Sequence, residues 1–278
     1  MTDGLYDDDP LTPEEREAFE EDLISFSDRE LGLLGDIHNL NVLYAGGAAP
    51  LWLEGLSQRI GDGGSLTAIE ADVDLVEQAR ESLEVAGLSA PVSLVVGNVF
   101  EPPFASGAFD LVYSAGLFHE LDVREKPAED VLAALARVIR PGGRMATSDW
   151  VDMHEEPSPA DLEWERMEAE AECEISGMRL HGIGSPERLI RLHEKFLRDT
   201  RWRVSSPYPL RHLDKLMLSE PDEPTEYASL SGDTRRKLLT RRAALKERIR
   251  REGYGRPATL YVEGWKNPPV DDAPGRRE

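Results

Sequence analysis

The chain has 278 residues, with 54 acidic against 32 basic side chains and a formal net charge of -22. This length suits one large domain with a substantial core, and the acidic balance disfavours binding of nucleic acid through bulk electrostatics. Cys173 is the only cysteine, which excludes an intrachain disulfide and a cysteine-based zinc cluster. The acidic N-terminus lacks a signal-peptide pattern and no run of about 18 apolar residues occurs, so we expect a cytoplasmic protein.

The first part of the chain predicts a disordered stretch over 1–10 and a helical brace over 11–38. Thr12 and Glu15 predict a helix N-terminus, and a second short helix is expected from Arg29 to Leu34. The segment VLYAGGAAP (42–50) then begins as an apolar strand and runs into a turn of small residues and a helix-like pattern. Small residues at such a turn let the backbone approach a ligand closely.

Strand and helix patterns alternate after this turn. Strands are predicted at 66–72, 92–98, 109–115 and 143–151, and helices at 74–85 and 128–139. Alternation at this spacing indicates parallel βαβ units with right-handed crossovers.

The pattern changes beyond residue 151. An acidic helical segment (155–180) and a helix at 185–198 precede two further strands, 202–210 and 258–266, and the tail 267–278 reads as disordered. Between those strands lies an insertion, 211–256, that carries a basic helix at 234–251. This helix could be solvated or grip an anionic substrate, but we rank first its pairing with the acidic helical segment.

Two later strings, read together with the turn at 42–50, carry a specific resemblance. They are GNVFEPPFASGAFDLVYSAGLFHELD (97–122) and LARVIRPGGRMATSDW (135–150). The chain resembles the class I S-adenosylmethionine-dependent methyltransferases, within them the small-molecule branch that includes ubiquinone and menaquinone biosynthesis methyltransferases. The resemblance implies an α/β fold: a Rossmann-like, doubly wound, seven-stranded, mostly parallel sheet with one antiparallel strand. It places the methyltransferase domain at 39–266, with helical insertions 155–184 and 211–256.

The resemblance also implies S-adenosyl-L-methionine as cofactor. Glu70, at the end of the second strand, would accept the ribose hydroxyls, while Asn98 and Val99 would meet the adenine. Ser114 and Ala115 would face the methionine ammonium. The remaining implied cofactor residues lie on the glycine loop or beside Glu70: Tyr44, Gly46, Gly47, Ala48 and Ala71.

The glycine loop departs from the family pattern at three positions. Tyr44 stands where the family has an acidic residue, and Ala48 and Pro50 stand where it has glycines. A methyl group at position 48 is expected to crowd a methionine carboxylate, and Pro50 removes a backbone donor while suiting the first turn of a helix.

The substrate side is expected to begin at Phe118 and His119. Methyl transfer is an in-line displacement, so a base helps only where the nucleophile carries a proton, and His119 is the candidate for that base. Residues expected to contact the substrate are Phe118, Asp149, Trp150, His154 and His181. A metal site of His119, His154 and His181 has no metal spacing, so we expect no metal.

Three hypotheses remain at this stage. The first is an active methyltransferase on a small molecule, the second a degenerate fold that binds a metabolite or protein without transfer, and the third a nucleic-acid methyltransferase using the basic helix. We favour the first, with a small-molecule substrate, no membrane span, an unlikely nucleic-acid role and a possible homodimer.

Overall fold

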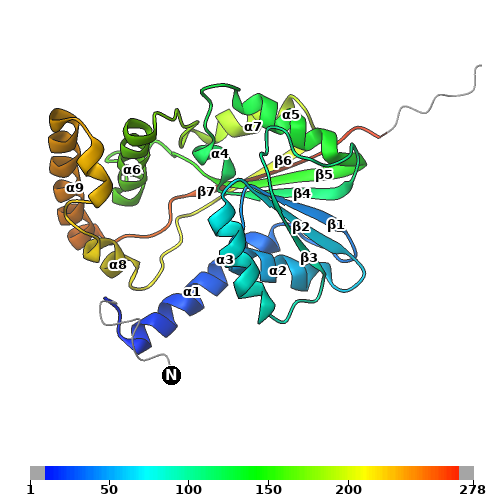
Figure 1. Cartoon of the computed structure of the whole chain (residues 1–278), viewed down its shortest axis with the longest axis horizontal. Coiled ribbons are helices and arrows are strands. Elements are labelled where there is room, and N and C mark those ends of the chain that lie inside the picture. The colour runs from blue at the N-terminus through cyan, green and yellow to red at the C-terminus, as the bar shows by residue number, and fades with distance from the viewer. Residues whose placement is uncertain (1–9, 269–278) are drawn as a thin grey trace, which may run out of the picture.

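A computed structural model describes residues 10–268, and its centre is a single seven-stranded sheet (Figure 1). The sheet order is β3-β2-β1-β4-β5-β7-β6. In chain order the strands are β1 (Asn41–Ala45), β2 (Ser65–Glu70), β3 (Val92–Val96), β4 (Phe109–Ala115), β5 (Ile139–Trp150), β6 (Arg198–Ser205) and β7 (Thr259–Trp265). The predictions of disorder for 1–10 and 267–278 fall mainly on residues outside the described range.

The strand directions confirm the expected fold class. β1 pairs in parallel with β2 on one side and with β4 on the other, so the chain moves away from β1 in both directions along the sheet. Only β7 runs against its neighbours, because it pairs antiparallel with both β5 and β6. This is the doubly wound arrangement in which a ligand crevice forms where the strand order reverses.

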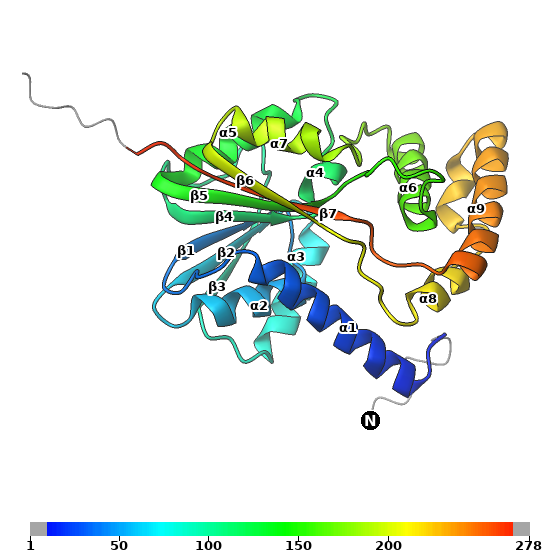
Figure 2. The same cartoon turned by 180° about the vertical axis from the view of Figure 1, so that it is seen from behind.

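Helices cover both faces of the sheet, with α1, α2 and α3 on one side and α4, α5 and α7 on the other (Figures 1 and 2). In chain order the helices are α1 (Pro13–Gly32), α2 (Pro50–Ile60), α3 (Val73–Glu84), α4 (Leu117–Glu120), α5 (Ala128–Val138), α6 (Ala160–Ser176), α7 (Pro186–Glu194), α8 (Leu213–Ser219), the 3-10 helix η1 (Thr225–Ser229) and α9 (Gly232–Glu252). No helix within residues 10–268 is long and apolar enough to cross a membrane.

Strand β1 shows how the sequence builds two cores. Its side chains alternate between the faces of the sheet, so Val42 and Tyr44 join the cluster beneath α2, while Leu43 and Ala45 join the cluster beneath α5. All four are buried, which explains why this strand reads as a continuous apolar run.

The N-terminal brace is one helix, so the prediction of a separate short helix at Arg29–Leu34 was wrong. The predicted start is confirmed, because Thr12 and Glu15 form a complete capping box. Ser27 interrupts the sequence pattern as a weak helix former, but it is buried beside α2, together with Leu31. Packing of this face therefore overrides the low local propensity.

The region before β7 also differs from the sequence expectation. α7 ends at Glu194 rather than Arg198, and β6 covers Arg198–Ser205 rather than 202–210. Pro207 and Pro209 have no backbone N–H and cannot extend the ladder, which accounts for the early end of β6.

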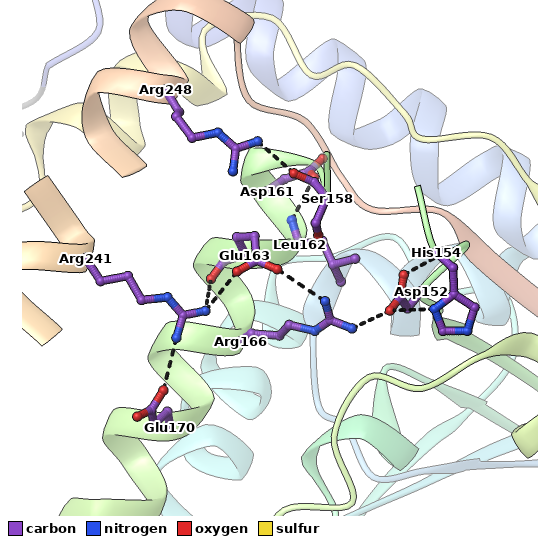
Figure 3. A network of polar contacts seen from close by, with 10 residues as sticks. All are labelled: Asp152, His154, Ser158, Asp161, Leu162, Glu163, Arg166, Glu170, Arg241 and Arg248. Carbon is purple, nitrogen blue, oxygen red and sulfur yellow. Dashed lines mark hydrogen bonds and ion pairs between the residues drawn. The ribbon is translucent and has the colours of Figure 1, made fainter. Parts of the chain in front are cut away.

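The two insertions pack together as a helical cap formed by α6, α8, η1 and α9 (Figures 1 and 2). The basic helix α9 pairs with the acidic helix α6, as the sequence predicted. Arg241 bridges Glu163 and Glu170 at 3.0 Å each (Figure 3), and the buried Arg242 pairs with Glu168. The cap therefore uses basic side chains mainly to satisfy neighbouring carboxylates.

The buried His193 makes stability sensitive to acid. Its Nε2 lies 2.9 Å from Thr147 Oγ1 and its Nδ1 2.9 Å from the Leu189 carbonyl oxygen. Burial lowers the pKa of His193 to about 4, so the unfolded chain takes up a proton that the fold excludes between about pH 6.5 and 4. The contribution of the neutral His193 to the free energy of unfolding is therefore complete above pH 6.5. It is lost as the pH falls through this window, by about 3 kcal/mol in total.

His193→Gln should weaken this acid sensitivity, because the amide keeps a donor and an acceptor but does not titrate. Urea unfolding of both proteins at pH 7.5 and 5 measures the free energies. We expect the wild type to lose more stability than the variant over this interval, and equal losses would contradict the assignment.

Candidate functional site

The carboxyl ends of β1, β2 and β3, together with α4 after β4, border a cleft of about 780 Å³. It lies where the strand order reverses, the usual ligand position in such sheets. Five of the predicted cofactor residues line it: Gly46, Glu70, Ala71, Asn98 and Val99. The structure therefore brings together residues from three separate strand ends.

Glu70 is held by its own turn. Its Oε1 accepts hydrogen bonds from the backbone N–H of Ala71 at 2.6 Å and of Asp72 at 2.9 Å. Its Oε2 has no hydrogen-bond partner within residues 10–268, so one carboxylate oxygen is available to a ligand. Asn98 is also constrained, because its Oδ1 accepts from the Phe100 N–H at 2.9 Å.

The glycine loop keeps a ligand-ready shape despite its altered sequence. Gly46 has φ 76°, and a Cβ there would lie 2.3 Å from Leu117 Cδ1, so this position requires glycine. Ala48 is buried in the core beneath the loop and does not line the cleft. Its methyl group therefore leaves the cleft open, contrary to the expectation that it would crowd a ligand there. Pro50 is the first residue of α2.

Tyr44 replaces the family's acidic residue by filling space under the loop. Its ring stacks on Tyr113, with centroids 5.8 Å apart and an interplanar angle of 25°. Burial raises the pKa of the Tyr44 hydroxyl above its ordinary value of 10, so the group stays neutral. Its hydroxyl oxygen would lie 2.9 Å from a Cβ on Gly47, so Tyr44 supports the loop by direct contact.

Gly47→Ala should therefore destabilise the protein by about 1 to 3 kcal/mol, because the new methyl group would lie within about 3 Å of the buried Tyr44 ring, which must shift out of its stacked position to admit it. Gly87→Ala is the matched control, since a Cβ there meets nothing within 4 Å. Thermal unfolding of both variants measures the difference. Equal changes in melting temperature would show that Tyr44 does not fill this space.

A histidine and a buried aspartate meet beyond the cleft. His119 Nδ1 lies 2.6 Å from Asp149 Oδ1, and Asp149 Oδ2 accepts the Phe118 N–H at 2.6 Å. The Trp150 N–H also donates to Asp149, at 2.8 Å, and the Trp150 ring stacks on the imidazole at 4.6 Å between centroids. Asp149 was predicted to contact substrate, but its carboxylate is taken up by these protein groups.

The Asp149 contact sets the proton distribution of His119. An ionised carboxylate can only accept, so Nδ1 is the donor and Nε2 the free nitrogen of the neutral ring. Burial by itself lowers the pKa of His119, but the hydrogen bond and charge of Asp149 outweigh it, and the pKa is raised above its ordinary value. Glu120 adds to this effect, with Oε1 3.6 Å from Nε2.

A second pocket, of about 250 Å³, opens between α1 and the strand ends. Its walls include the predicted residues Tyr44, Ala115, His119, Asp149 and Trp150. They also include residues that sequence reasoning missed: Phe26, Glu30, Trp52, Arg256 and Thr259. These residues come from segments outside the recognisable motifs, and nothing in their local sequence marks them.

A third cavity, of about 720 Å³, separates this region from the cap. His119 and Glu120 form part of one wall, and α6 contributes Glu165 and Cys173 to the other. Glu120 borders all three cavities, so the cleft of about 780 Å³, the aromatic pocket and the cap cavity meet at this residue, next to His119.

Six predicted residues do not line these three cavities: Gly47 and Ala48 on the glycine loop, and Ser114, Phe118, His154 and His181. Ser114 is fully buried and donates to Thr147 Oγ1 at 3.2 Å. Phe118 and His181 border only a small space of about 20 Å³, where burial lowers the pKa of His181 to about 4. His154 is 72% exposed and pairs with Asp152 at 3.2 Å (Figure 3), away from His119.

Comparison with known proteins agrees with this geometry. Residues 44–147 match the family model described as a methyltransferase domain. Over residues 44–147 the chain is therefore similar to methyltransferase domains. The matched segment covers the glycine loop, Glu70, Asn98 and His119, whereas α1, the cap and β7 lie outside it.

Individual relatives match over part of their length. The chain is 32% identical over 98 residues to 27-O-demethylrifamycin SV methyltransferase from Amycolatopsis mediterranei, covering 35% of this chain and 34% of the relative. It is 33% identical over 101 residues to the ubiquinone/menaquinone biosynthesis C-methyltransferase of Psychromonas ingrahamii, covering 36% and 38%. The chain thus matches little more than a third of either methyltransferase.

Solved structures extend the likeness in fold. The YcgJ protein from Bacillus subtilis superimposes with a TM-score of 0.55 at 14% identity, covering 91% of this chain and 99% of that one. The shared fold includes regions well beyond the segment matched in sequence.

Proposed function

We propose that this chain transfers a methyl group from S-adenosylmethionine to a small-molecule acceptor, with His119 as the general base. The observation that carries the proposal is the His119–Asp149 pair: the imidazole borders two of the three cavities and adjoins Glu120, which borders all three. The family match over residues 44–147 supports the same reaction class.

The residues at the cleft are suited to the cofactor. The free Oε2 of Glu70 can accept from a ribose hydroxyl, and the volume of about 780 Å³ accommodates a nucleoside. When bound, S-adenosylmethionine supplies an electrophilic methyl group on a positively charged sulfur. The chain must then exclude water and align the acceptor.

His119 would remove the proton from an acceptor oxygen, nitrogen or carbon. The acceptor proton moves to Nε2, the nucleophile's electron pair forms the new bond to carbon, and the carbon–sulfur bond breaks. The resulting imidazolium is stabilised by Asp149 at Nδ1 and by Glu120 near Nε2. Asp149 acts here as a positioning residue, because it fixes the tautomer and charge of His119 without facing the acceptor.

A nucleic-acid substrate is a weaker candidate. The basic side chains of α9 that a nucleic acid would need are engaged internally, with Lys237 and Arg241 on Glu170 and Lys246 on Asp222. We therefore propose a role in small-molecule metabolism in the cytoplasm.

Isothermal titration tests cofactor binding. Wild-type protein should bind S-adenosylhomocysteine, and Glu70→Gln should weaken this binding roughly tenfold to a hundredfold, because a charge-assisted hydrogen bond to the ribose is lost. Glu81→Gln, on the exposed face of α3, is the control and should bind normally. No heat with either S-adenosylmethionine or S-adenosylhomocysteine at millimolar concentration would refute the proposed function.

The pH dependence of turnover tests the base. Release of S-adenosylhomocysteine during incubation with S-adenosylmethionine and a panel of phenols, hydroxy acids and amines reports transfer to any of these acceptors. Since His119 must be neutral to act, kcat/KM should rise with pH through a pKa above 6.5. His119→Ala should lower kcat about 10²- to 10⁴-fold.

Asp149→Asn distinguishes positioning from structural support. Removing the charge leaves burial as the main influence on His119, so the acid limb of the profile should move to lower pH while the maximal rate falls. An unchanged profile with a reduced rate would mean that Asp149 has only a structural role.

A further inference from the structure

Arg256 holds its guanidinium between two aromatic rings in a pocket wall, without a carboxylate partner in residues 10–268. Within residues 10–268 the group makes no hydrogen bond or ion pair, and its contacts are the rings of Trp150 at 5.5 Å and Phe26 at 5.6 Å. Burial lowers the pKa of Arg256 and Glu165 partly offsets this, but a guanidinium remains charged. A desolvated guanidinium suits a carboxylate or phosphate, which it binds through parallel hydrogen bonds.

Thr259 provides a second observation in the same pocket. The residue is 4% exposed and borders the cavity of about 250 Å³ with Arg256. Its Oγ1 is buried without a hydrogen-bond partner in the described part of the chain. An unsatisfied buried hydroxyl is costly and points to a missing ligand group.

The N-terminus of α2 contributes at the same cavity. Its N-cap is Ala49, which lines the pocket and supplies no side-chain acceptor to the first turn. Pro50 has no N–H and the Trp52 N–H donates to the Ala49 carbonyl at 3.1 Å, so within residues 10–268 the Leu51 N–H is the first-turn donor left without a partner. The helix dipole adds partial positive charge at this end. Three independent features of this pocket therefore favour an anion.

The position of the pocket identifies the anion. It is bordered by Tyr44 in β1 and by Ala115 and Gly116 at the end of β4, and it meets the cleft of about 780 Å³ at Glu120. We propose that Arg256, Thr259 and the N-terminus of α2 form a carboxylate subsite that holds the amino-acid end of the cofactor. This inference rests on the proposed function. The subsite would compensate for the backbone donor that Pro50 removes from the loop.

A carboxylate could come from the cofactor or from an acceptor, and ligand truncation separates the two. Isothermal titration would compare S-adenosylhomocysteine with its decarboxylated analogue, which keeps the adenosine, sulfur and amine. Arg256→Gln should weaken binding of S-adenosylhomocysteine roughly tenfold to a hundredfold and change binding of the analogue less than about twofold. Thr259→Val should act in the same direction with a smaller loss.

Arg201→Gln is the matched control, because Arg201 also lies over a tryptophan, Trp265 at 5.2 Å, but on an exposed strand away from the pocket. It should leave both affinities unchanged. Melting temperatures establish that each variant is folded. If Arg256→Gln does not fold, the binding data of Thr259→Val decide the test.

The outcomes are distinct. Equal losses for both ligands, or no loss for either, would overturn the carboxylate subsite while leaving the proposed function intact. Unchanged binding of S-adenosylhomocysteine with reduced turnover would assign Arg256 to the acceptor and also overturn it. Failure of the wild type to bind either ligand would remove the proposed function and the subsite together.

Discussion

The geometry of the site depends on one buried carboxylate, that of Asp149. It is 2% exposed and accepts hydrogen bonds from the His119 ring and from the backbone amides of Phe118 and Trp150. A carboxylate this deeply buried is tolerable only because each oxygen is occupied by donors. Since the donors come from α4 and from the end of β5, the same interaction fixes the short helix against the sheet and orients the imidazole.

Charge pairing shapes the cap in a comparable way. The chain as a whole carries a net charge of -22, but helix α9 is locally basic, and its arginines pair with the carboxylates of α6. Arg242 is 2% exposed on its side chain and also contacts the Trp164 ring at 4.5 Å. The cap core thus combines apolar packing with an arginine that is buried while its carboxylate partners remain partly exposed. Figure 3 shows that Arg166 extends the network from α6 to Asp152 after β5.

The sequence predicts the elements of this fold better than their contacts. Periodicity is local, so strands such as Phe109–Ala115 were found at their observed bounds. The end of β6 and the continuity of α1 depend on packing with distant segments, which a local pattern does not contain. Among site residues, Gly46 and Glu70 follow from their motif, but the contact between His119 and Asp149 spans 30 positions, and Arg256 lies far outside any motif. Long-range proximity of this kind requires the fold itself.

The altered glycine loop illustrates how a motif can change while its shape persists. In the family pattern an acidic residue anchors the loop by hydrogen bonds, whereas Tyr44 supports it by volume and stacking on Tyr113. The Ala48 methyl group turns into the core, and Pro50 provides the fixed φ that the first turn of α2 requires. All three residues are compatible with the backbone conformation of the loop, but Pro50 also removes a backbone N–H that could donate to a ligand. A lost donor can be replaced by groups that reach the same pocket from elsewhere. Arg256, just before β7, and Thr259, its first residue, line that pocket, and neither side chain has a hydrogen-bond partner within residues 10–268.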